Sequence, residues 1–269
     1  MRWCSFTTAS DGSARLGAVS PQDDTGRVLD VAGWARSRDA QSPQDLIDLV
    51  ESSPATQQRV TDLVRSAPPD GVGWVRPDEV RLLAPLRTPG SLRHVVARSG
   101  AVPVFSHVAR RVVTGPDEDV ALPPYARELV VVCQVAAVVG RRGRDLSPAE
   151  AVETVLGYTL MAQWAAPEVG REVATSLGPW VVTPDEWEPR AGHAVQVDVE
   201  GGAVFRGTTD ERPWTFGQAL AWVSQGEDLW PADVVGLGGG GQAVGPGQQV
   251  AVTVEGLGTL TARLSPASP

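Results

Sequence analysis

One segment of this chain, residues 128–139 (ELVVVCQVAAVV), constrains the fold more than any other. It is a near-continuous run of apolar, mostly β-branched residues that only Gln134 interrupts. Such a run is typical of a strand buried on both faces, because a strand with one face in water alternates apolar and polar residues. It is too short to span a bilayer as a helix. A chain of 269 residues with 42% hydrophobic content can build a large core around such a strand.

Patterns on either side of this run predict further strands and helices. Alternating segments predict strands at 3–7, 14–19, 27–31, 80–86, 195–199, 234–235, 249–255 and 259–264. Capping and periodicity predict helices after Ser42-Pro43, over about 54–65, from the capping box at 147–150 to about 156, and over 216–224. Breaks at 67–71 and 88–90 favour a strand-and-helix domain over 1–84 and a strand-rich domain over 85–269. The fold class is α+β, with a β-roll or similar mixed sheet.

Composition excludes several classes of function. The net charge of -9 and the pI of about 4.9 make nucleic acid a poor partner. The chain contains no lysine, so Schiff-base catalysis is excluded. Cys4 and Cys133 are too few and too far apart for a disulfide framework or a zinc site. No stretch resembles a signal peptide or a membrane span, and we therefore expect a cytoplasmic protein.

A series of motifs resembles the fumarylacetoacetate hydrolase superfamily in their order along the chain. The longest is 175–189 (TSLGPWVVTPDEWEP). Shorter matches are 82–93 (LLAPLRTPGSLR), 115–120 (GPDEDV), 138–141 (VVGR), 157–159 (GYT), 214–217 (WTFG) and 229–234 (LWPADV). The resemblance implies the mixed β-roll of that family behind a small N-terminal domain, and a homodimer.

Members of that superfamily hold Mg²⁺ or Ca²⁺ through an E-x-E strand and further aspartates. By the resemblance, these positions carry Val132, Gln134, Gln163 and His94 here. Two amides, a valine and a histidine cannot supply the negative charge that offsets dehydration of a hard cation. We therefore expect no metal and no other cofactor. The rival alignment takes Glu128 as a ligand, which requires a register slip and still leaves one carboxylate.

Four other positions complete the expected pocket. The resemblance places Arg171 at the family's lysine, where a guanidinium can anchor an anion, and Gly239 at a loop threonine. His107 resembles a histidine beside the pocket, and Trp164 follows Gln163 directly. The plainer alternatives are structural roles for His94 and His107, and a hydrogen bond between the two glutamines.

The sequence and the resemblance together favour a metal-independent enzyme acting on a β-dicarbonyl or enol-type substrate by isomerisation, cyclisation or carbon–carbon lyase chemistry. Its partner is a small anionic or enolisable molecule, without nucleic acid or membrane. The expected catalytic residues are His94, Gln134, Gln163 and Arg171, and the expected substrate-binding residues are His107, Val132, Trp164 and Gly239. The absence of lysine and asparagine suggests a GC-rich bacterial source and specialised metabolism. Two alternatives stay open: an inactive partner subunit, and a metal-dependent carbon–carbon hydrolase or decarboxylase.

Overall fold

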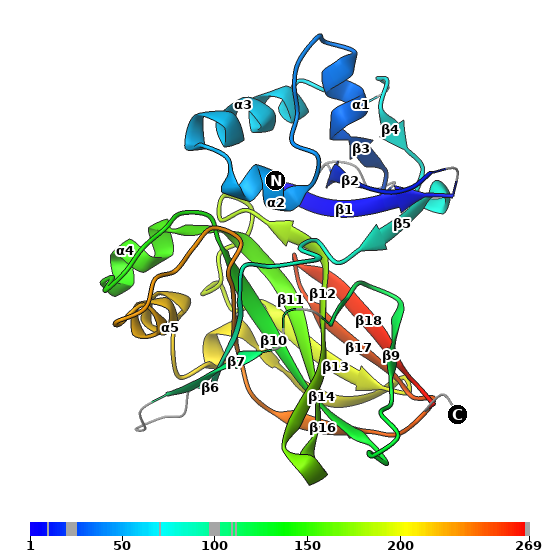
Figure 1. The fold of residues 1–269 in the computed structure, drawn as a ribbon, viewed down its shortest axis with the longest axis vertical. Helices are drawn as coiled ribbons and strands as arrows, with labels where there is room; N and C mark the ends of the chain where they lie inside the picture. Colours follow the sequence, from blue (N-terminus) through cyan, green and yellow to red (C-terminus); the bar gives the residue numbers. More distant parts are fainter. Residues whose placement is uncertain are drawn as a thin grey trace.

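Two β-sheets dominate the computed structural model, which describes residues 1–9, 11–19, 26–69, 71–96, 103–108, 110 and 112–266 (Figure 1). The larger sheet runs in the order β4 (Trp74–Val75), β3 (Val28–Asp30), β2 (Asp11–Val19), β1 (Arg2–Thr8), β12 (Arg171–Val182), β11 (Val155–Ala166), β10 (Leu129–Val139), β15 (Val234–Leu237), β6 (Leu92–Val96) and β7 (Val104–Val108). To it are added β5 (Val80–Leu83) on β1, β8 (Val113–Thr114) on β12 and β16 (Gly241–Val244) on β10. The smaller sheet runs β14 (Gly202–Thr208), β13 (Ala194–Val199), β17 (Gln249–Val254), β18 (Gly258–Ser265) and β9 (Glu118–Ala121). The predicted sheet-dominated α+β architecture is confirmed.

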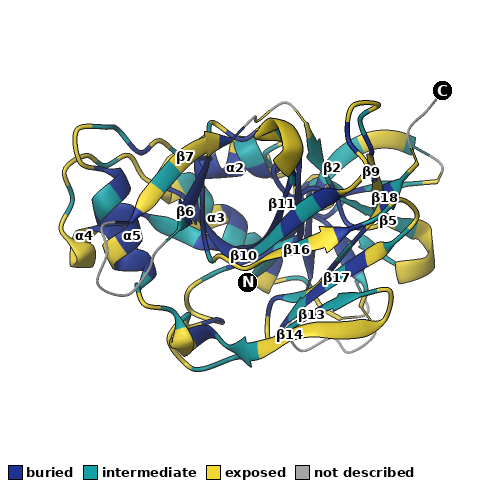
Figure 2. Ribbon diagram, turned by 90° about the horizontal axis from the view of Figure 1, so that it is seen from below, coloured by how far each residue is buried: buried dark blue, intermediate teal, exposed yellow. Residues whose placement is uncertain are grey.

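Strand β10 is the apolar run from which the sequence prediction began. It pairs with β11 along its whole length, and with β15 and β16 on its other edge. Val131 and Val135 on one face pack in a core shared with β13 and β17 of the smaller sheet. Ala136 and Val138 on the other face pack in a core shared with the N-terminal strands and helices. From Gln134 to Val139 the strand is buried on both faces, as its composition predicts, while Val130, Val132 and Cys133 are half-buried (Figure 2).

The helices are short and lie at the periphery. They are α1 (Val31–Arg36), α2 (Leu46–Glu51), α3 (Pro54–Arg65), α4 (Pro148–Glu153) and α5 (Phe216–Val223), with single 3₁₀ turns at η1 (Pro77–Glu79), η2 (Pro167–Val169) and η3 (Thr209–Glu211). The helix expected after Ser42 begins at Leu46, because the carboxylate of Asp45 caps it by accepting from the Asp48 backbone N–H at 2.9 Å. The helix opened by the capping box at Ser147 is shorter than expected. None of the helices in the described ranges is long and apolar enough to cross a membrane.

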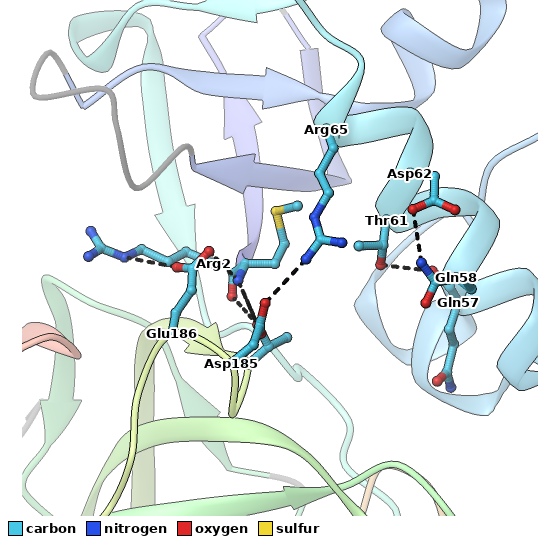
Figure 3. A network of polar contacts seen from close by, with 10 residues as sticks. Arg2, Gln57, Gln58, Thr61, Asp62, Arg65, Asp185 and Glu186 are labelled. Carbon is cyan, nitrogen blue, oxygen red and sulfur yellow. Dashed lines mark hydrogen bonds and ion pairs between the residues drawn. The ribbon is translucent and has the colours of Figure 1, made fainter. Parts of the chain in front are cut away.

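The N-terminal elements join the larger sheet directly. Strand β1 pairs with β12, with Arg2 opposite Val182 and Trp3 opposite Val181, so the sheet continues across the expected boundary near residue 84. Ion pairs between side chains reinforce this junction (Figure 3). Arg65 at the end of α3 lies 3.2 Å from the Asp185 carboxylate, and Arg2 lies 3.9 Å from Glu186.

A buried ion pair between Arg93 and Asp233 ties β6 to the turn before β15. The guanidinium lies 3.1 Å from the Asp233 carboxylate, and the two side chains are only 6% and 4% exposed. We expect Asp233→Ala to lower the free energy of unfolding by about 3–5 kcal/mol, because it leaves a buried cation without its nearest counter-charge. Arg76→Ala, which breaks the exposed Arg76–Asp78 pair, is the control and should leave stability unchanged. Urea unfolding measures both, and equal midpoints for the two variants would contradict the assignment.

Candidate active site

Four polar side chains lie in a row on one face of the larger sheet. Gln163 of β11 is directly opposite Thr175 of β12 and Val132 of β10. Gln134 shares the face of Val132, because side chains alternate along a strand. His94 of β6 is paired with Gly236 of β15, which in turn faces the Gln134 side chain. We call His94, Gln134, Gln163 and Thr175 the polar row.

The polar row is buried but poorly satisfied. His94, Gln134, Gln163 and Thr175 are 8%, 3%, 5% and 0% exposed. Within the polar row, the buried atoms that have no hydrogen-bond partner in the described part of the chain are His94 Nε2, both side-chain polar atoms of Gln134, Gln163 Oε1 and Thr175 Oγ. Each such group costs about 1–3 kcal/mol of stability, and native proteins rarely leave several together. Their convergence on one face is what a binding site for a polar ligand or ordered water requires.

Two glycines of β15 and the loop after it make room for Gln134. A Cβ atom at Gly236 would overlap the Gln134 side-chain oxygen, and one at Gly238 would lie 3.1 Å from Gln134 Cγ. No larger residue fits at 236 while Gln134 keeps this position. Glycine at positions 236 and 238 therefore leaves room for the long side chain of Gln134.

Glu172 fixes the orientation of Gln163. The Gln163 Nε2 donates to the Glu172 Oε1 at 2.7 Å. An ionised carboxylate only accepts hydrogen bonds, so the NH₂ group of Gln163 must face Glu172. The side-chain oxygen of Gln163 therefore faces the polar row, where it can accept a hydrogen bond from a bound molecule.

Burial governs the charge of His94. Desolvation lowers the pKa of His94, and this effect outweighs the opposing influence of the Gly238 backbone and the Gln163 side chain. A neutral imidazole near neutral pH can accept or donate one proton at Nε2, the ring nitrogen that lacks a partner. His94 is thus the group in the row best suited to proton transfer.

The donors at this site do not match a hard divalent cation. The row offers amide oxygens, a hydroxyl and one imidazole, with Glu172 as the nearby carboxylate. Among the described residues, no group of three or more His, Cys, Asp or Glu side chains could hold a metal ion. Glu128 lies exposed before the start of β10, and Val132 stands opposite Gln163 in the register. The structure therefore does not support the alternative alignment that makes Glu128 a ligand.

The other residues expected at the site do not all lie on the face of the polar row. Val132 flanks Gln163 on the face of the row. Trp164, by contrast, lies on the opposite face, fully buried, and donates from Nε1 to Ser176 Oγ at 3.0 Å. The sequence analysis expected Trp164 beside the ligand, but the structure places it on the other face of the sheet. Side chains alternate along a strand, so a direct neighbour of Gln163 must face the other way.

Arg171 and His107 also point away from the row. A bulge in the β11–β12 pairing places Glu172, and not Arg171, beside Gln163, while the Arg171 guanidinium lies 5.6 Å from the Tyr125 ring centre. His107 pairs with Arg93, whose side chain faces away from that of His94, and its Nε2 lies 3.6 Å from Glu227. The expected convergence of Arg171 and Trp164 with the glutamines is therefore not what the structure shows.

Gly239 lies in the loop between β15 and β16, close to the row, and lines a neighbouring cavity.

The sequence analysis did not identify Glu172 and Thr175 as site residues. A signal existed for each, because Glu172 directly follows the expected anion anchor and Thr175 opens the longest family-like segment.

Comparison with known proteins identifies the family of this chain. The sequence model of the family described as fumarylacetoacetate (FAA) hydrolase C-terminal matches residues 93–265. Protein Rv2993c of Mycobacterium tuberculosis is 28% identical over 240 residues, which cover 80% of this chain and 89% of that protein. The human mitochondrial oxaloacetate tautomerase FAHD2A is 28% identical over 182 residues, or 58% of each chain. A solved fumarylacetoacetate hydrolase from Exiguobacterium antarcticum superposes with a TM-score of 0.82 at 23% identity, over 100% of both chains. The chain belongs to the fumarylacetoacetate hydrolase family.

Proposed function

We propose that this chain is a metal-independent isomerase that interconverts the enol and keto forms of a small 2-oxo acid. The observation that carries the proposal is the polar row, in which an acceptor of fixed orientation at Gln163 lies beside a neutral histidine. An amide oxygen binds a hydroxyl but not a carbonyl oxygen, so it favours the enol. The tautomerase activity named for the human relative supports the same reaction class.

The proposed reaction needs only groups of the row. Gln163 Oε1 accepts a hydrogen bond from the enol hydroxyl and orients it. His94 Nε2 then takes this same proton from the hydroxyl and delivers it to the carbon α to the forming carbonyl group, so the carbon–carbon double bond becomes single while the carbon–oxygen bond becomes double. Gln134 Nε2 and the Thr175 hydroxyl donate to the oxygen as negative charge develops on it. No atom is gained or lost.

Glu172 acts as a positioning residue in this scheme. It holds the Gln163 amide in the required orientation through the 2.7 Å hydrogen bond, and it touches no reacting atom. The homodimer expected from the family resemblance stays a prediction, as do the source in specialised metabolism and the wider lyase or cyclase chemistry.

Substitutions in the row should lower turnover without unfolding the protein. The probe is oxaloacetate, whose enol is followed by ultraviolet absorbance in the presence of a chelator. We expect His94→Asn and Gln163→Ala each to reduce kcat/KM by about 10²-fold or more, since each removes a group that acts in the transition state. Gln249→Ala, an exposed glutamine on β17, should leave kcat/KM unchanged.

Two results would count against this function. The first is activity that requires added Mg²⁺ or Mn²⁺ and disappears with chelator. The second is no acceleration with oxaloacetate or with related 2-oxo dicarboxylic acids, and in that case the inactive-partner alternative becomes the better account.

The pH profile tests the role of His94 separately. Burial lowers the pKa of His94, so the imidazole is neutral above this value and loses its capacity to accept a proton below it. The rate should therefore be constant near neutrality and fall as the pH drops, with a midpoint below the ordinary histidine value of about 6.5. The residual rate of His94→Asn should lack this acid limb. If the fall in rate at low pH persists in His94→Asn, the group that titrates is not His94.

A further inference from the structure

A cavity lies between the two sheets, where the loop from β15 to β16 passes β10. Its volume is about 300 Å³. Apolar side chains from three strands form most of its wall: Val135 of β10, Val195 and Val197 of β13, and Val252 of β17. Val135 and Cys133 alternate with Gln134 and so face away from the polar row. Gly239 and Gln134 border the cavity where it approaches the row.

One cation lines this apolar cavity. Arg212, just after η3, contributes its side chain to the wall. Within the described ranges, its guanidinium has no hydrogen bond or ion pair, and its one specific contact is the Phe216 ring at 5.9 Å. The adjacent Glu211 also borders the cavity, but its carboxylate accepts from the Thr208 backbone N–H at 3.3 Å. Arg212 and Pro213 also line a neighbouring cavity of about 320 Å³, so the guanidinium stands between two voids.

The surroundings of Arg212 affect its pKa. Burial lowers the pKa of Arg212 to about 10, and the side chain still carries its charge at neutral pH. Arg212 is half-buried, so its guanidinium is only partly desolvated. The apolar wall and the one unpaired cation of this cavity together suit a ligand that carries an anion and an apolar body.

We propose that this cavity binds a monocarboxylate with an apolar chain or aryl group, with its carboxylate on Arg212 and its apolar body between β10, β13 and β17. The guanidinium supplies a bidentate fork for the carboxylate. The valine walls accept the apolar body, and the volume lies at the lower end of the range for small-molecule sites, which is about 300–1,000 Å³. The inference does not rest on the proposed isomerase activity, because Arg212 and the valines are not part of the polar row.

Octanoate binding tests the proposal, with 1-octanol as the uncharged comparison. Calorimetric titration of the wild type should give saturable binding of octanoate, and Arg212→Met should weaken it at least tenfold while changing 1-octanol binding little. Arg206→Met, an exposed arginine of β14 outside the cavity wall, is the matched control and should bind octanoate like the wild type. Val252→Phe should weaken both ligands by filling the cavity.

Thermal unfolding gives a second, independent readout. Without ligand, Arg212→Met should melt close to the wild type, because the half-buried guanidinium keeps part of its hydration. Saturating octanoate should raise the wild-type Tm and leave that of Arg212→Met nearly unchanged. Equal octanoate affinity in the two proteins, or no binding to the wild type at millimolar octanoate, would overturn the proposal. Turnover of oxaloacetate in Arg212→Met reports on the isomerase proposal separately.

Discussion

The antiparallel pairing of β10 with β11 holds Val132 opposite Gln163, and the candidate site depends on this register. Because side chains alternate along a strand, a slip of one residue would turn Gln134 into the valine core and bring Cys133 to the site. The apolar packing on both faces of β10 prevents such a slip. The same register turns Cys133 and Val135 toward the cavity near Arg212, which Gln134 of the row also borders.

The chain has the fold of its family. By the resemblance, most of the polar row occupies positions where other members hold a cation, and here the row consists of neutral amides, a hydroxyl and an imidazole. The nearby carboxylate of Glu172 is engaged with Gln163. Under the proposed function, the acceptor of Gln163 suits an enol hydroxyl better than a metal ion. A bound substrate would then complete the hydrogen bonds of the unpaired atoms of the row.

Much of the fold could be predicted from local signals. The capping box at Ser147 and the apolar run of β10 each specify their element through nearby residues. The site was harder, because it depends on which face each side chain takes and on one bulge. Trp164 was expected beside the ligand through its nearness to Gln163 in sequence, although alternation turns it into the core. Arg171 was displaced by the bulge that brings Glu172 to the site, and no local pattern reveals a bulge of this kind.

A crystal structure with oxalate, an analogue of the enol form, and excess Mn²⁺ would test the central claim most directly. The account predicts oxalate oxygens within hydrogen-bond distance of His94, Gln134 and Thr175, about 2.7–3.2 Å, with no anomalous manganese signal at the row. A manganese peak with oxygen ligands from Gln134, Gln163 and Glu172 would contradict it. Side chains packed against one another, with no space for oxalate, would contradict it equally.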